Sequence, residues 1–91
     1  MIHFTLYSRS YCHLCDDMLA ALKAQLSGRV ADIRVVDVDA DPALIALYDE
    51  LVPVLMARGR DTSDQELCHY FLDAQRVEQF LQDEASSVRS G

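Results

Sequence analysis

The apolar pattern changes its period between residues 8 and 12, and this change limits the possible folds more than any other feature of the chain. Residues 2–7 are apolar or β-favouring and predict a strand, whereas residues 12–27 carry apolar side chains at helical spacing. Residues 33–38 are rich in β-branched side chains, which is typical of a strand buried on both faces of a parallel sheet. A strand, a helix and a strand in this order predict a right-handed crossover between two parallel strands.

The rest of the chain supplies two more strands and two more helices. Asp41 followed by Pro42 predicts a helix start, and this helix is expected over residues 43–50. A third strand is expected from or just after Pro53 to residue 57, a fourth over 66–71, and a last helix after Asp73. The predicted class is therefore α/β, in the order β-α-β-α-β-β-α, with a four-stranded mixed sheet and three helices. We expect one domain over residues 1–85 and a flexible tail over 86–91.

The charge balance and the apolar content bear on partners and compartment. The 91 residues are 51% apolar, as in an ordinary globular protein. The formal net charge of −7 disfavours nucleic acids and anionic membranes as partners. No membrane-spanning run of about 20 apolar residues is present, and residues 1–9 lack the pattern of a secretory signal. We therefore expect a cytoplasmic setting, where a close cysteine pair is catalytic or metal-binding. We also expect the chain to act as a monomer.

Two of the three cysteines, Cys12 and Cys15, stand three residues apart where the first helix is predicted to begin. At this spacing in a helix the Cα atoms lie about 5.5 Å apart, within the range that a disulfide requires. Cys12 is at the helix amino end, where the free N–H groups favour negative charge, so we expect it to ionise more readily and to attack first. Cys15 is the expected resolving thiol. His13 between them is expected to influence the redox balance of the pair.

Other interpretations of the cysteine, histidine and aspartate residues stay open. The pair could be half of a zinc site with His3, His13, Cys68 or His69, although Cys68 and His69 are adjacent on a strand and should point to opposite faces. Cys68 is expected to be a buried apolar residue, with a second redox-responsive thiol as the alternative. The alternating carboxylates that end at Asp41 are interpreted as caps, because the loop lacks the glycine and the final glutamate of an EF-hand.

Three segments together resemble a known family. These are the run Arg-Ser-Tyr-Cys-His-Leu-Cys over residues 9–15, the Val-Asp-Val-Asp-Ala-Asp-Pro turn over 36–42, and Val52-Pro53 at the head of the third strand. The chain is similar to glutaredoxins of the thioredoxin fold, and most similar to small bacterial glutaredoxin-like proteins with a Cys-His-Leu-Cys motif. The resemblance implies a thioredoxin-like fold and a glutaredoxin-like thiol–disulfide oxidoreductase with Cys12 and Cys15 as its catalytic pair.

The same resemblance implies a substrate-binding set. In such proteins the proline after the second helix is cis and faces the dithiol, and the residue before it offers its backbone to the substrate, which here gives Pro53 and Val52. Arg9, Tyr11 and His13 are the other expected substrate-binding residues. For Arg9, contact with a glutathione carboxylate or with the Cys12 thiolate and simple solvation are both open. Tyr11 could line the site or only pack beside it.

The implied partners are mixed disulfides of proteins or of glutathione, with no bound cofactor, no metal, and glutathione as a candidate reductant. The chain departs from glutaredoxins after the fourth strand, where their Gly-Gly pair is replaced by Tyr-Phe-Leu-Asp over residues 70–73. The first cysteine is also followed by His13 instead of proline. The alternative function is therefore a thioredoxin-fold binding module with little or no redox turnover.

Overall fold

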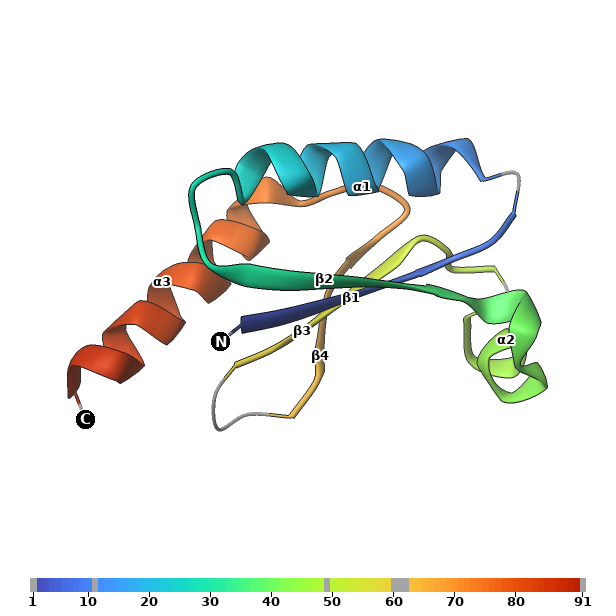
Figure 1. Cartoon of the computed structure of the whole chain (residues 1–91). Helices are drawn as coiled ribbons and strands as arrows, with labels where there is room; N and C mark the ends of the chain where they lie inside the picture. The colour runs from blue at the N-terminus through green and yellow to red at the C-terminus, as the bar shows by residue number, and fades with distance from the viewer. Residues whose placement is uncertain (1, 11, 49, 60–62, 91) are drawn as a thin grey trace.

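A computed structural model of the chain describes residues 2–10, 12–48, 50–59 and 63–90, with side chains described up to residue 84. The strands are β1 (Ile2–Ser8), β2 (Ala31–Asp37), β3 (Val54–Arg58) and β4 (Gln65–His69). The helices are α1 (His13–Gln25), α2 (Pro42–Tyr48) and α3 (Ala74–Ser90), and a short 3-10 helix, η1 (Val38–Ala40), follows β2. Figure 1 shows this order along the chain, which is the predicted one apart from η1.

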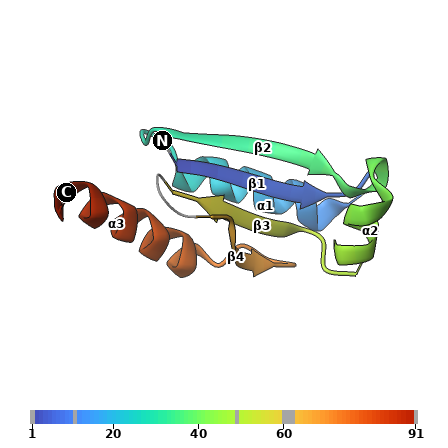
Figure 2. The same ribbon diagram turned by 90° about the horizontal axis from the view of Figure 1, so that it is seen from below.

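The four strands form one mixed sheet in the order β2-β1-β3-β4. β1 pairs with β2 in parallel, while β3 is antiparallel to both β1 and β4. The parallel pair confirms the predicted crossover through α1, and Figure 2 shows the strands side by side with α2 beyond one end of the sheet. Because β1 ends where β3 begins, the loops after β1 and before β3 emerge at the same end.

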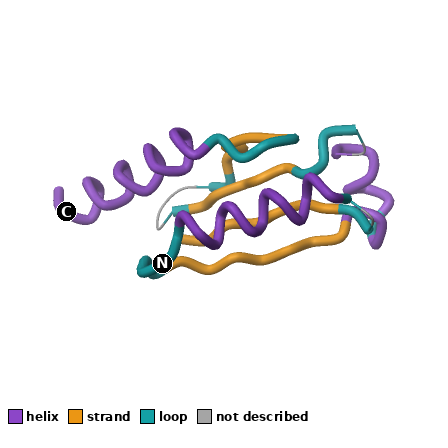
Figure 3. The backbone as a smooth tube through the Cα atoms, turned by 90° about the horizontal axis from the view of Figure 1, so that it is seen from above, coloured by secondary structure: helices purple, strands orange, loops and turns teal. Residues whose placement is uncertain are grey.

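The core lies between one face of the sheet and the helices α1 and α3. Phe4 and Leu6 of β1 are buried against Met18 and Leu22 of α1, at the helical spacing that the sequence predicted. On the α3 side, the rings of Phe4 and Phe80 meet edge to face at 6.1 Å. Figure 3 shows α1 lying along the strands on this face. The core therefore fixes α1, and with it the start of α1, relative to β1.

The prediction that the second strand is buried on both faces is wrong. β2 is an edge strand, none of its residues is buried, and Asp32, Arg34, Val35 and Asp37 are exposed. Its β-branched side chains satisfy strand propensity, which does not by itself distinguish an edge strand from a central one. One face of the sheet stays largely uncovered by helices in the described part of the chain.

The helix caps explain where the helices begin. The carboxylate of Asp41 accepts the Ala43 N–H at 2.9 Å ahead of α2, and that of Asp73 accepts the Arg76 N–H at 3.1 Å ahead of α3, as predicted. α3 then continues to Ser90, through most of the segment 86–91 that is predicted to be a flexible tail. No proline or glycine interrupts residues 74–90, so nothing in the sequence stops the helix before the last residue. None of the helices among the described residues is long and apolar enough to span a bilayer.

β4 differs from the simple alternation that was predicted for residues 66–71. The register with β3 shifts between Leu55 and Met56, so Cys68 lies opposite Leu55 while Leu67 falls at the bulge. Leu67 and Cys68 are consequently both buried, although they are neighbours in the sequence. The strand ends at His69, two residues earlier than expected.

Candidate functional site

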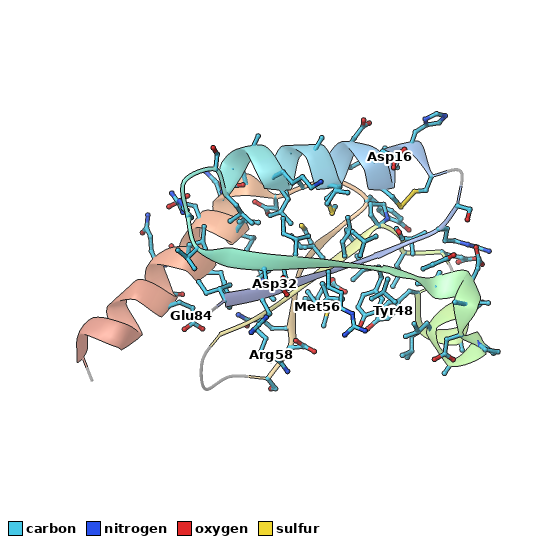
Figure 4. The ribbon with its side chains drawn as sticks, in the orientation of Figure 1. Asp16, Asp32, Tyr48, Met56, Arg58 and Glu84 are labelled. Atoms are coloured by element: carbon cyan, nitrogen blue, oxygen red, sulfur yellow. A yellow bond between two sulfur atoms is a disulfide. The ribbon has the colours of Figure 1, made fainter. Side chains whose placement is uncertain are left out.

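Cys12 and Cys15 form a disulfide at the amino end of α1. Their Cα atoms are 5.2 Å apart, within the range of roughly 4.4–6.8 Å found for disulfides. Figure 4 shows the yellow sulfur–sulfur bond at the start of this helix. The two cysteines therefore lie at the distance that the sequence spacing predicted.

Cys12 is the N-cap residue of α1, one position earlier than the first helical residue, His13. Its backbone is extended, with φ −106° and ψ 103°, and its Sγ accepts a hydrogen bond from the Cys15 N–H at 3.1 Å. A sulfur at this position satisfies one of the helix N–H groups that have no partner within the helix. The same N–H group, together with the helix dipole, favours negative charge on that sulfur.

The two sulfurs differ in access. Cys12 is half-buried, whereas Cys15 is only 4% exposed. His13 is exposed on the first turn of α1. A molecule arriving from solvent can thus reach Cys12 first, with Cys15 held behind it on the next turn.

Val52 and Pro53 precede β3 and are joined by a cis peptide bond. Tyr7 of β1 pairs with Val54 of β3. Val52 and Pro53, which come just before Val54, therefore lie at the same end of the sheet as the loop that leads from β1 to Cys12. Pro53 is fully buried, whereas Val52 is half-buried. The fold therefore brings the two predicted substrate-binding residues and the dithiol to one end of the molecule.

Tyr70 is a residue of this region that the sequence analysis did not assign to the site. Its backbone has φ +66°, a left-handed conformation that is uncommon for a tyrosine. Its N–H donates to the Pro53 carbonyl oxygen at 2.9 Å, and its hydroxyl donates to the Glu50 carbonyl oxygen at 2.7 Å. A glycine or asparagine would have signalled such a turn, but a tyrosine carries no signal of that kind.

Arg9 lies between β1 and α1 and makes an ion pair with Asp39 of η1. Its Nη2 is 2.7 Å from one Asp39 carboxylate oxygen and its Nε is 3.3 Å from the other. The Asp37 carboxylate accepts the Asp39 N–H at 2.9 Å and so holds η1 in place. Arg9 therefore has a carboxylate partner within the chain. Tyr11, the remaining predicted site residue, lies outside the described residues.

The third cysteine lies in the core and not at this end of the sheet. Cys68 is 9% exposed and belongs to the cluster between the sheet and the helices. Burial raises the pKa of its thiol, so the neutral form is favoured there. Its neighbour His69 is exposed, as expected for the opposite face. Over the described ranges, no three His, Cys, Asp or Glu residues are grouped so as to hold a metal ion.

A model of the glutaredoxin-like domain (DUF836) matches residues 3–82. A search of curated proteins found no match. The family match covers every element from β1 to most of α3.

Two solved structures are similar in both sequence and fold. Protein Ne2328 from Nitrosomonas europaea is 35% identical, with a TM-score of 0.75 over 87% of this chain and 89% of that one. The structural genomics target XcR50 from X. campestris is 32% identical, with a TM-score of 0.58 over 88% of this chain and 96% of that one. Thioredoxin 1 from Thermosipho africanus is 18% identical, with a TM-score of 0.62 over 91% and 98% of the two chains. This last likeness shows the thioredoxin-like fold, in agreement with the predicted class.

Proposed function

The chain belongs to the glutaredoxin-like domain family, and from this membership we propose that it is a thiol–disulfide oxidoreductase. Cys12 and Cys15 would alternate between a dithiol and a disulfide. The observation that carries the proposal is the placement of a solvent-accessible sulfur at the N-cap of α1, with a second, buried sulfur in bonding range. Protein disulfides and glutathione mixed disulfides are the proposed substrates.

The reaction has two exchange steps. The Cys12 thiolate attacks a client disulfide, forms a mixed disulfide with one client sulfur and releases the other as a thiolate. The Cys15 thiolate then attacks the Cys12 sulfur, closes the intramolecular disulfide and releases the second client sulfur. Two electrons pass to the client, whose two thiolates take up protons from solvent, and the chain is left oxidised. A reducing thiol such as glutathione regenerates the dithiol, which suits a monomer working in the reducing cytoplasm.

The groups around the dithiol have separate tasks in this scheme. The helix amino end stabilises the thiolate that attacks and, later, leaves. The backbone at Val52 is available to pair with an extended client segment that lies beside the disulfide, and Pro53 carries no N–H to compete for it. His13 is exposed next to Cys12 and contacts the client residues that flank the mixed disulfide.

A redox titration against glutathione buffers tests the proposal. The fraction of each cysteine that reacts with an alkylating reagent is measured by mass spectrometry across the buffer series. We expect Cys12 and Cys15 to convert together in one two-electron transition, and Cys68→Ser to leave that transition unchanged. Independent titration of Cys12 and Cys15, or no conversion of either, contradicts the proposal.

Turnover with a disulfide substrate separates the two cysteines. Cys12→Ser should abolish exchange, whereas Cys15→Ser should still form a mixed disulfide that accumulates because nothing resolves it. Cys68→Ser is the matched control, since it removes a thiol that lies in the core. Full exchange activity in Cys12→Ser would rule out the assigned nucleophile.

The alternative is a binding module that docks partners without turnover. It is favoured by two exposed apolar side chains, Leu14 at 37%, between His13 and Cys15, and Phe71 at 69%, directly after Tyr70. Partner capture of equal affinity by the oxidised protein, the reduced protein and Cys12→Ser would support this alternative against the redox function.

A further inference from the structure

The sheet face that points away from α1 carries a cavity that the dithiol chemistry does not use. Its volume is about 280 Å³, at the small end of the range of roughly 300–1,000 Å³ for ligand pockets. Figure 4 shows Arg58, Met56 and Tyr48 on this side of the sheet. Neither Cys12, Cys15 nor Pro53 is among the residues that line it.

Strand register explains which side chains share this face. Thr5 lies beside Arg34 of β2, and His3 lies beside Arg58 of β3. All four line the cavity. The two arginines flank β1 from opposite sides, about 10 Å apart across the sheet, so their long side chains can meet over that strand. The polar end of the cavity thus has two guanidinium groups.

Neither guanidinium is engaged by another side chain or backbone group that the structure describes. Within the described part of the chain, no hydrogen bond or ion pair involves the side chain of Arg34 or of Arg58, whereas Arg29 pairs with Glu78 at 3.1 Å. The nearby His3 is paired with Asp32 at 3.4 Å. Asp64 is the one carboxylate that lines the cavity. The lining therefore sets two arginines against one carboxylate, while Asp32 and Glu66, the strand partners of His3 and Met56, lie on the same face of the sheet outside the lining.

The other end of the cavity is apolar and aromatic. It is lined by Val36 of β2, Leu44 of α2 and Tyr7 of β1. The ring of Tyr48 stacks on that of Tyr7 at 4.6 Å with an angle of 24° between the planes, which gives this end a firm wall. The cavity thus changes from cationic to apolar along β1.

We propose that this cavity is a binding site for a small organic anion, with a carboxylate or phosphate group held by Arg34 and Arg58 and a compact apolar or aromatic body against Tyr7, Val36 and Leu44. Arginine pairs bind planar and tetrahedral oxyanions through paired charge-assisted hydrogen bonds. The volume admits one small molecule and no more. The site lies apart from the dithiol, so the proposal does not rest on the redox function.

Titration followed by NMR of the backbone amides tests the site on the full chain. The probes are phenyl phosphate and benzoate, with inorganic phosphate and benzyl alcohol as the two half-ligands. We expect saturable shifts at Thr5, Arg34 and Val36 with both aromatic anions, and weaker binding of each half-ligand. Which aromatic anion binds more tightly shows whether the site prefers phosphate or carboxylate.

Single charge-removing variants provide the matched comparison. Arg34→Gln and Arg58→Gln should each weaken binding of the aromatic anions by about tenfold, as loss of a charge-assisted contact implies. Arg29→Gln, which removes an equal charge at the α1–α3 side, should leave binding unchanged. Cys12→Ser should also bind normally, which separates this site from the dithiol.

Three results would overturn the proposal. The first is the absence of saturable shifts at these amides, and the second is equal binding by Arg34→Gln and Arg29→Gln. The third is a concentration-dependent change of the same amides without any probe, because that would show a second copy of the chain covering this face.

Discussion

The N–H of Tyr70 donates a hydrogen bond to the carbonyl oxygen of Pro53, across 2.9 Å, from a backbone conformation with φ +66°. The end of β4 is thereby tied to the residue that precedes β3. The Tyr70 hydroxyl adds a second tie, to the Glu50 carbonyl oxygen. One residue thus supports the segment over residues 50–53 from two directions, next to the cis peptide bond that heads β3.

Tyr70→Phe should loosen this segment while leaving the fold intact. The change removes the hydroxyl bond to Glu50 alone, so we expect a loss of about 1 kcal/mol in the free energy of unfolding. Urea denaturation measures the loss, and amide exchange at residues 50–52 should rise selectively. Tyr70→Gly is the companion variant, because it relieves the left-handed conformation but removes the same hydroxyl. Unchanged exchange at residues 50–52 in Tyr70→Phe would show that the hydroxyl bond does not hold the segment.

Arg9 and Asp39 give a prediction that separates a structural role from a substrate role. The side chains of both residues are more than a third exposed, so the pair should contribute only about 0.2–1 kcal/mol to stability. If Arg9 serves the fold alone, Arg9→Gln and Asp39→Asn should each have a small effect on unfolding and none on exchange kinetics. A rise in KM for Arg9→Gln that Asp39→Asn does not share would show that Arg9 contacts the substrate. Double-mutant cycles on stability and on KM distinguish the two outcomes.

The sequence predicted those parts of the fold that local chemistry controls. Asp41 and Asp73 cap helices because a carboxylate two or three residues before a free N–H is a local feature. The spacing of Cys12 and Cys15 likewise sets their separation without help from the rest of the chain. These features could be predicted from the sequence alone.

Other features depend on contacts that are distant in the sequence. The exposure of β2 follows from its place at the sheet edge, which strand propensity does not reveal. The bulge at Leu67 and the turn at Tyr70 arise because β4 must pair with β3 while its own end meets Pro53. The pairing of Arg9 with Asp39 likewise joins residues 30 positions apart. No local pattern predicted these relationships.

Gly59 is the residue at which close packing excludes a side chain. A Cβ there would overlap the carboxyl group of Glu84, a buried acidic residue of α3. Gly59→Ala should therefore lower the free energy of unfolding by about 1 kcal/mol, since the Glu84 carboxyl must swing aside. In a Glu84→Ala background the same change should cost much less. Equal costs in both backgrounds, measured by urea denaturation, would show that Glu84 is not the group that opposes a side chain at Gly59.

Ionisation of the Cys68 thiol should make stability depend on pH in the oxidised protein. Cys12 and Cys15 cannot titrate in that form. Burial raises the pKa of the Cys68 thiol above its ordinary value of 9.0. Between the pKa of the unfolded chain and that of the folded chain, the unfolded chain loses its proton first. The free energy of unfolding should therefore fall as pH rises through this window.

The comparison with Cys68→Ala isolates this contribution. The alanine variant should be less stable at every pH because it leaves a small cavity, but its stability should fall less steeply above pH 9 or so. Tyr48 also has a raised pKa, chiefly through burial, and its part of the slope remains in both proteins. Urea denaturation of the oxidised proteins from about pH 7 to about pH 10 measures the two slopes. Parallel slopes would mean that the folded protein does not hold the Cys68 thiol in its neutral form.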